Sequence, residues 1–189
     1  METKNELRKK ILNIRNNMSR EDVINKSSSI MNKLTDMDEY KNSNTVFIYM
    51  SFRNEVATVE LIERMLSENK HVVIPYTDTK NTVLIPSELK SMEEDLALSP
   101  FGYYEPVYEK LRTVEPERFD LIIVPGVVFD RQLNRIGFGK GYYDRILCRK
   151  RKGVKAIAVA YDFQVLEKIP AEAHDIKMDM IITEKCNIH

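Results

Sequence analysis

Short, strongly apolar runs recur along the chain, and the segments between them carry apolar residues at every third or fourth position. Runs of four to eight residues that are rich in β-branched side chains are typical of strands buried on both faces, as in a parallel sheet. The pattern therefore predicts core strands at 45–50 (TVFIYM), 71–75 (HVVIP), 121–124 (LIIV) and 154–161 (VKAIAVAY), with a further strand at 82–85.

The intervening segments have the period of amphipathic helices. A helix over 4–18 places Lys and Arg on one face and, on the other, Leu7, Ile11, Ile14 and Met18. Ser19 predicts the N-cap of a second helix over 20–34, and Thr58 that of a helix over 59–67. We expect an α/β fold: one three-layer domain over residues 1–189, with a mostly parallel central sheet flanked by helices. Segment 91–108 is expected to be irregular.

Composition and charge exclude several classes of protein. There are 29 basic and 29 acidic residues, so no global field attracts nucleic acid or a membrane surface. No apolar run approaches the roughly 20 residues of a membrane span. The N-terminus METKNELRKK lacks the apolar core of a secretory signal, which predicts a cytoplasmic location. Cys148 and Cys186 lack CxxC spacing, so we expect neither a cysteine metal site nor a disulfide framework.

The candidate chemistry lies after the third apolar run, in Gly137-Phe138-Gly139-Lys140-Gly141. Three of the six glycines of the chain fall within these five residues. Alternate glycines allow backbone N–H groups to face an anion just before a helix, and a lysine adds a mobile positive charge. The pattern indicates a phosphate-binding loop. It matches neither the Walker nor the dinucleotide fingerprint, so a plain tight connection stays open on this motif alone.

The flanking residues extend the motif to PGVVFDRQLNRIGFGKGYYDRIL (125–147). This stretch resembles the signature of 5-formyltetrahydrofolate cyclo-ligases, which commonly reads PGxxFDxxGxRxGRGxGYYDxxL. Two departures are Leu133 in place of glycine and Phe138 in place of arginine. The C-terminal IPAEAHDIKMDMIITE (169–184) resembles the family's IPxExHDxxxDxIITE block, so that the resemblance spans nearly the whole chain.

The resemblance implies an ATP- and Mg²⁺-dependent conversion of 5-formyltetrahydrofolate to 5,10-methenyltetrahydrofolate, with release of ADP and phosphate. Because an amide-like formyl oxygen is a poor leaving group, it is first phosphorylated, and N10 then closes the ring and expels phosphate. The protein must supply positioning and charge neutralisation. The positions with catalytic roles by this resemblance are Arg135, Lys140 and Tyr142.

The same resemblance assigns the binding residues. The nucleotide set consists of Lys4, Arg8, Arg135, Ile136, Gly137, Phe138, Gly139, Lys140, Gly141, Tyr142 and Tyr143. The folate set consists of Met50, Glu55, Phe138, Gly139, Lys140, Gly141 and Tyr142, with the Glu55 carboxylate suited to a pair of N–H donors on the pterin. Asp144 and Asp179 match the positions associated with Mg²⁺.

Several alternatives stay open from the residues. The implied fold also fits a sugar-phosphate isomerase-like or CoA-transferase-like enzyme, which needs no ATP, and a binder that releases no phosphate. The folate partner is expected with or without a polyglutamate tail, for which the basic cluster at 145–155 is one candidate contact. Phe101, Tyr103 and Tyr104 fit either packing or stacking on a flat ring. The chain is expected to be a monomer or a homodimer.

Overall fold

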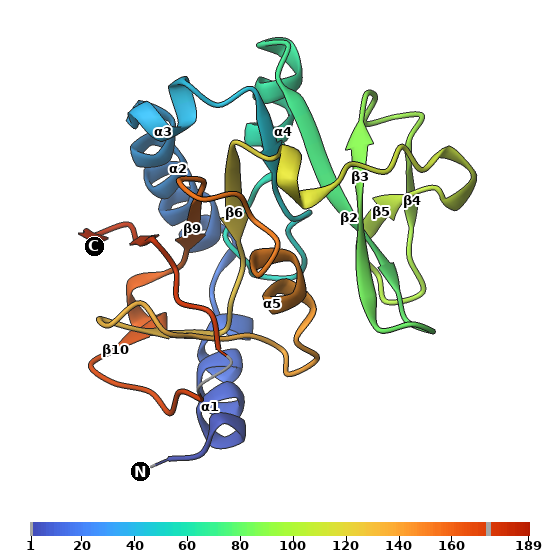
Figure 1. Ribbon diagram of the computed structural model, residues 1–189. Helices are drawn as coiled ribbons and strands as arrows, with labels where there is room; N and C mark the ends of the chain where they lie inside the picture. The colour runs from blue at the N-terminus through green and yellow to red at the C-terminus, as the bar shows by residue number, and fades with distance from the viewer. Residues whose placement is uncertain (1, 173–174) are drawn as a thin grey trace.

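The protein, seen in a computed structural model that describes residues 2–172 and 175–189, is built around a seven-stranded sheet (Figure 1). The strand order is β12-β11-β9-β6-β1-β2-β3. Neighbours from β11 to β2 pair in parallel, whereas β12 and β3 at the two edges pair antiparallel. The strands are β1 (Thr45–Phe47), β2 (His71–Asp78), β3 (Val83–Leu89), β6 (Leu121–Val124), β9 (Lys155–Val159), β11 (Met180–Ile182) and β12 (Asn187–Ile188). The predicted mostly parallel sheet is confirmed.

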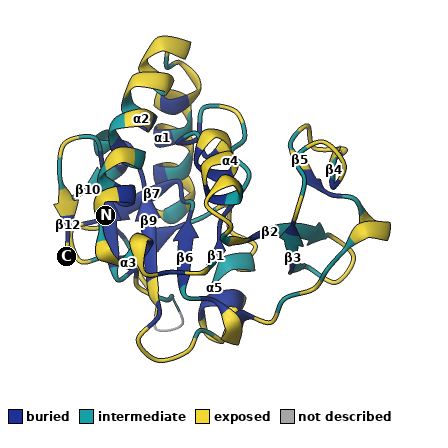
Figure 2. Ribbon diagram, turned by 90° about the horizontal axis from the view of Figure 1, so that it is seen from above, coloured by how far each residue is buried: buried dark blue, intermediate teal, exposed yellow. Residues whose placement is uncertain are grey.

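Helices cover both faces of this sheet because its strands are apolar on both sides. Val46 and Ile48 face the cluster that includes residues of α2, α3 and α4, whereas Phe47 faces the cluster that includes α5. In Figure 2 the central strands are dark blue and the helices are yellow on their outer sides. The helices are α1 (Lys4–Asn16), α2 (Arg20–Asp36), α3 (Asp38–Lys41), α4 (Val59–Ser67) and α5 (Tyr142–Leu147). In the described part of the chain, none is long and apolar enough to cross a membrane.

Of the two predicted helix caps, that of α2 is confirmed and that of α4 is wrong. Ser19 caps α2 as expected, by accepting a hydrogen bond from the Asp22 amide at 3.0 Å. Thr58 precedes α4, but the prediction of a side-chain cap is wrong. Its hydroxyl donates to the Tyr49 carbonyl at 2.8 Å and accepts from the Ser51 amide at 3.0 Å. Thr58 therefore closes the loop between β1 and α4 instead of starting the helix.

A second, three-stranded sheet with the order β10-β7-β8 lies between the core and α1. It contains β7 (Val128–Asp130), β8 (Arg135–Ile136) and β10 (Val165–Leu166). The sequence pattern did not predict it, because its strands are two or three residues long. Asp130 is fully buried and holds the turn by accepting hydrogen bonds from the Asn134 amide at 2.9 Å and the Ile169 amide at 3.1 Å. This sheet leads the chain into the glycine-rich loop.

The expectation that 91–108 is irregular is wrong in part. It contains the antiparallel strands β4 (Leu96–Leu98) and β5 (Tyr104–Pro106). They lie apart from the helices, beside β2 and β3 (Figure 2). Asp95 anchors this region, because its carboxylate pairs with Arg112 at 2.7 Å, and that contact lowers the pKa of Asp95 to about 2. Three short 3-10 helices complete the described elements: η1 (Tyr108–Lys110), η2 (Pro116–Arg118) and η3 (Asp162–Gln164).

Candidate functional site

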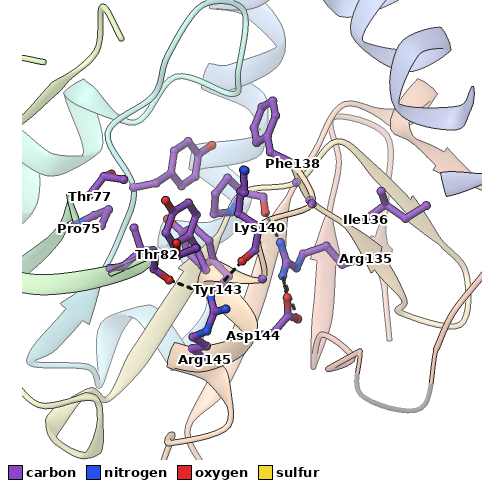
Figure 3. Close-up of a pocket in the computed structure, with 18 of the residues that line it drawn as sticks. Pro75, Thr77, Thr82, Arg135, Ile136, Phe138, Lys140, Tyr143, Asp144 and Arg145 are labelled. Atoms are coloured by element: carbon purple, nitrogen blue, oxygen red, sulfur yellow. Dashed lines mark hydrogen bonds and ion pairs between the residues drawn. The ribbon is translucent and has the colours of Figure 1, made fainter. Parts of the chain in front are cut away.

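A cavity of about 1160 Å³ opens at the carboxyl ends of β1, β2 and β6. This edge is where open α/β sheets bind their ligands. The side of the cavity formed by β2 and the following turn carries Pro75, Thr77 and Thr82, and the opposite side carries Phe138, Lys140 and Arg135 (Figure 3). Every residue that the sequence predicted for the nucleotide and folate sets lines this one cavity.

The glycine loop, residues 137–141, connects β8 to α5 and lies against α1. Arg8 donates from Nε to the Gly137 carbonyl at 2.7 Å. A Cβ on Gly137 would lie 2.7 Å from Nη1 of Arg135, which is closer than real side chains allow. Gly139 has φ +91°, and a Cβ there would lie 3.3 Å from Nη2 of Arg8. The glycines therefore let two guanidinium groups approach the loop backbone closely.

Lys4 stands one turn before Arg8 on α1 and also lines the cavity. Its Nζ lies 2.7 Å from Asp175 and 3.2 Å from Glu172. Burial lowers the pKa of Lys4, but hydrogen bonds to these two carboxylates outweigh that effect and raise it overall. Lys4 and Arg8 thus line the same cavity, and their contacts tie α1 to the C-terminal segment and to the glycine loop, respectively.

Arg135 and Asp144 form a pair beneath the glycine loop. Nη2 of Arg135 lies 3.1 Å and 3.2 Å from the two carboxylate oxygens of Asp144 (Figure 3). The Arg135 guanidinium also lies 5.7 Å from the ring centroid of Tyr143, and its Nε is buried with no hydrogen-bond partner among the residues that the structure describes. Burial raises the pKa of Tyr143 well above its ordinary value, so its hydroxyl stays protonated.

Lys140 is exposed at the tip of the glycine loop, and within the described residues its ammonium group forms no ion pair. Its carbonyl accepts a hydrogen bond from Nη1 of Arg145 at 2.9 Å. The same Nη1 donates to the Thr82 carbonyl at 2.9 Å, so Arg145 joins the glycine loop to the turn after β2 (Figure 3). Thr82 has φ +55°, a strained value for a β-branched residue.

Glu55 lies in the wall of the cavity, in the loop after β1. It is 8% exposed, and its Oε2 accepts a hydrogen bond from the Phe52 amide at 3.0 Å. Burial raises the pKa of Glu55, although the nearby Arg15 and this hydrogen bond act in the opposite direction. Met50 lines the cavity from the same loop, three residues after β1 ends.

Arg15 is the buried charge that sequence reasoning missed. The expected apolar face of the first helix included Ile14, yet Ile14 is 43% exposed and Arg15 only 3%. The signal was present, because Arg15 continues the spacing of four residues from Leu7 to Ile11. From the sequence, Arg15 is indistinguishable from the solvated Lys and Arg residues of the polar helix face. Only the packed structure shows that its side chain is buried.

The structure does not bring Asp144 and Asp179 together, which corrects the expected joint Mg²⁺ site. Asp144 lines the cavity, whereas Asp179 immediately precedes β11, at the amino end of the sheet. There its Oδ2 accepts a hydrogen bond from the Ala156 amide at 2.8 Å and lies 3.3 Å from Nζ of Lys150. The described residues contain no group of three or more acidic, histidine or cysteine side chains that could hold a metal ion.

Phe101, Tyr103 and Tyr104, which follow β4 and lead into β5, line the cavity, and Phe101 and Tyr103 also pack on each other. The ring centroids of Phe52 and Tyr103 are 5.5 Å apart, and those of Phe101 and Tyr103 are 6.0 Å apart. Phe101 and Tyr104 are each 55% exposed. Tyr103 is fixed by a hydrogen bond from its hydroxyl to Thr77 at 3.0 Å, so this wall has a rigid centre and an exposed rim.

The basic cluster after α5 is largely paired within the protein. Arg149 pairs with Glu115 and Glu117, and Arg151 pairs with Asp120 at 2.9 Å. This local pairing does not support the cluster as the contact for a polyglutamate tail. His174 of the C-terminal motif lies outside the described residues.

Comparison with known proteins gives one consistent result. A model of the 5-formyltetrahydrofolate cyclo-ligase family matches residues 1–184. The 5-formyltetrahydrofolate cyclo-ligase of Mus musculus is 31% identical over 176 residues, covering 88% of this chain and 86% of its own length. That of Saccharomyces cerevisiae is 30% identical and covers 100% of this chain and 99% of its own. The 5,10-methenyltetrahydrofolate synthetase of Aquifex aeolicus matches with a TM-score of 0.84 and 38% identity, covering 97% of this chain and 91% of its own.

Proposed function

Because the chain belongs to the 5-formyltetrahydrofolate cyclo-ligase family, we propose that it converts 5-formyltetrahydrofolate to 5,10-methenyltetrahydrofolate with ATP and Mg²⁺. The observation that carries this proposal is the meeting of two kinds of wall in one cavity. One wall is the glycine loop with its cations, and the other contains the buried carboxylate Glu55 and the aromatic side chains. A volume of about 1160 Å³ exceeds the usual range for one small ligand, which suits two substrates side by side.

The cationic wall suits the phosphates of ATP. Gly137 and Gly139 leave the loop backbone open, and Arg8 and Lys140 supply positive charge beside it. Lys140 has no acidic partner among the described residues, so it is available to a transferring phosphoryl group. Arg135 acts behind the loop, where it holds Asp144 and supports Tyr143. The adjoining nucleotide contacts are proposed for Lys4, Ile136 and Tyr142, which line the same wall.

The opposite wall suits the folate. Glu55 can accept the paired N–H donors of the aminopyrimidine edge while Met50 and Phe52 contact the ring. The substrates supply the reacting atoms themselves. The formyl oxygen bonds to the γ-phosphorus as the bond from phosphorus to ADP breaks. N10 then bonds to the formyl carbon, the bond from that carbon to the phosphorylated oxygen breaks, phosphate leaves, and N10 loses its proton to solvent.

Asp144 fits a magnesium ion held mainly by phosphate. Its carboxylate lines the cavity and keeps part of its surface exposed despite the pair with Arg135. One or two carboxylates suffice for a Mg²⁺ ion whose remaining ligands are phosphate oxygens and water, so a larger acidic cluster is not needed. When bound, the ion would neutralise charge on the phosphates of ATP.

The test is to incubate the protein with 5-formyltetrahydrofolate and Mg²⁺, with and without ATP, and to follow the methenyl chromophore and phosphate release together. We expect both signals only with ATP, in equal amounts. Conversion without ATP would favour the isomerase-like or transferase-like alternative. Binding of both ligands without phosphate release would favour a non-catalytic binder.

A further inference from the structure

Arg15 lies where three parts of the candidate site meet. Its Nη1 donates to the Gly126 carbonyl, after β6, at 3.4 Å, and its Nη2 lies 3.8 Å from Oε1 of Glu55. Its guanidinium carbon is 5.9 Å from the ring centroid of Phe138 in the glycine loop. Arg15 is not part of the cavity wall itself. It sits behind Glu55, and it can influence a bound ligand only through neighbouring residues.

A buried guanidinium is costly unless its charge and its donors are matched. Nε of Arg15 has no hydrogen-bond partner among the described residues, so the fold leaves one donor unsatisfied to place the group here. The ion pair that the structure gives Arg15 is the one with Glu55. Phe138, at the position where an arginine is common in the signature, puts an uncharged ring in front of Arg15. Glu55 is therefore the group whose charge Arg15 balances.

Glu55 is held on two sides. The Phe52 amide donates to Oε2, and Arg15 faces Oε1, so each oxygen keeps lone-pair capacity toward the cavity. The tyrosines Tyr49, Tyr143 and Tyr161 also lie near Glu55, and burial raises the pKa of each, which keeps them neutral. Among the described groups that act on the charge of Glu55, the cation is Arg15.

The loop of Glu55 is also tied to the end of α1 that carries Arg15. Asn54 donates from Nδ2 to the Arg15 carbonyl at 2.8 Å and to the Met18 carbonyl at 3.2 Å. The backbone and the side chain of Arg15 thus contact consecutive residues of one loop. Movement of Glu55 relative to α1 would break both contacts at once.

We propose that Arg15 is a positioning residue for the folate: it keeps Glu55 ionised and oriented so that both carboxylate oxygens can accept N–H donors of the aminopyrimidine edge. This inference rests on the function proposed above and adds to it a residue outside the cavity. It predicts that the charge of Arg15 is needed for folate recognition and not for binding of ATP.

The experiment measures the affinity for 5-formyltetrahydrofolate, without ATP, as a function of pH in wild type, Arg15→Gln, Arg15→Met and Arg15→Lys. Without a cation behind it, buried Glu55 takes up a proton at higher pH. The pH below which the protein loses its affinity for the folate should therefore be higher in the glutamine and methionine variants than in wild type. Near pH 7 we expect affinity to fall about tenfold or more, KM for the folate to rise, and kcat and ATP affinity to change little. Arg15→Lys should recover most of the loss, because it restores the charge.

Glu55→Gln supplies the reference, because it has no carboxylate to titrate. In that background Arg15→Gln should cause no further loss of folate affinity. Three outcomes would overturn the proposal. The pH below which folate binding is lost would be the same in the Arg15 variants as in wild type, Arg15→Gln would lower folate affinity equally in the wild-type and Glu55→Gln backgrounds, or Arg15→Lys would not recover the affinity. Failure of both the glutamine and methionine variants to fold, judged by circular dichroism and melting, would also overturn it, since Arg15 would then serve the fold. A wild-type protein that neither binds the folate nor forms the methenyl product would instead contradict the proposed function.

Discussion

Both ends of the central sheet carry charged side chains, but these charges have different partners at the two ends. At the amino end, carboxylates cap the strands: Asp120 accepts a hydrogen bond from the Thr45 amide at 2.9 Å, and Asp179 accepts one from the Ala156 amide at 2.8 Å. Both carboxylates are also paired with cations, Arg151 and Lys150 respectively. At this end the charges satisfy the protein itself.

The carboxyl end has the opposite polarity, because the strands finish in free carbonyl groups. Here the Pro125 carbonyl accepts from Arg135 at 3.5 Å and the Gly126 carbonyl accepts from Arg15 at 3.4 Å. Cations collect at these acceptors, and Lys140 remains without an acidic partner in the described part of the chain. The comparison explains why we propose an anion site at the carboxyl end: cations gather there at the strand carbonyls, and the carboxylates described at that end do not neutralise all of their charge.

The largest effect is expected for Lys140→Met, which removes a cation that pairs with no acidic group in the described residues and keeps most of the side-chain stem. If Lys140 stabilises charge that grows on the transferring phosphoryl group, turnover should fall by about two orders of magnitude or more, with a modest loss of ATP affinity. Steady-state kinetics and ATP titration measure the two quantities. Lys155→Met is the matched control from the amino end of the sheet, where turnover should stay near the wild-type value.

A raised KM for ATP with unchanged kcat in Lys140→Met would show that Lys140 contributes uniform binding only. The difference between Lys140→Met and the control Lys155→Met would then lie in ATP binding and not in the chemical step. The charge that promotes phosphoryl transfer would have to come from Arg8 and the metal ion.

Glu55→Gln should have the next largest effect, on the wall of the cavity proposed to bind the folate. The substitution keeps the shape but removes charge-assisted hydrogen bonds, which are typically worth about 1.5–3 kcal/mol. Affinity for 5-formyltetrahydrofolate should fall by roughly ten- to a hundredfold, whereas ATP affinity serves as the internal control. Equal folate affinity in wild type and variant, measured by titration, would remove Glu55 from the folate site.

Asp144→Asn and Asp179→Asn test the comparison directly, because the two carboxylates lie at opposite ends of the sheet. Asp144→Asn should raise the Mg²⁺ concentration for half-maximal turnover by about tenfold or more. Asp179→Asn should leave that concentration unchanged and lower the free energy of unfolding by about 1 kcal/mol or less, from the loss of a partly exposed ion pair with Lys150. A raised Mg²⁺ requirement in Asp179→Asn would contradict the proposal that Asp144, and not Asp179, holds the metal ion.

The sequence predicted the parts of the molecule that depend on long or periodic signals. The four core strands follow from apolar runs, and the glycine loop follows from its unusual composition. The sequence did not reveal β7 and β8, because strands of two or three residues carry no measurable period. Nor did it reveal the orientation of Arg15 or the distance between Asp144 and Asp179. Those features depend on how α1 packs and on which end of a strand a residue occupies.

The smallest effect concerns backbone strain in the turn between β7 and β8, which precedes the glycine loop. Leu133 lies in the turn from β7 to β8 that leads to the glycine loop, and its φ is +69°. A residue with a Cβ pays about 1–2 kcal/mol in this conformation, and glycine does not. At an ordinary position glycine is instead less stable than alanine by about 0.5–1 kcal/mol, because its unfolded chain has more freedom.

The informative comparison is therefore Leu133→Gly against Leu133→Ala, since both remove the partly buried side chain. Strain relief should exceed the entropic cost, so the glycine variant should be the more stable of the two by about 0.5–1 kcal/mol. Urea unfolding with equal m-values measures the difference. Leu98 in β4, which is 63% exposed, is the control position. There the alanine variant should have the higher free energy of unfolding, and the glycine variant the lower. If alanine is the more stable at both positions, the turn at Leu133 relaxes without cost, and its positive φ stores no measurable strain.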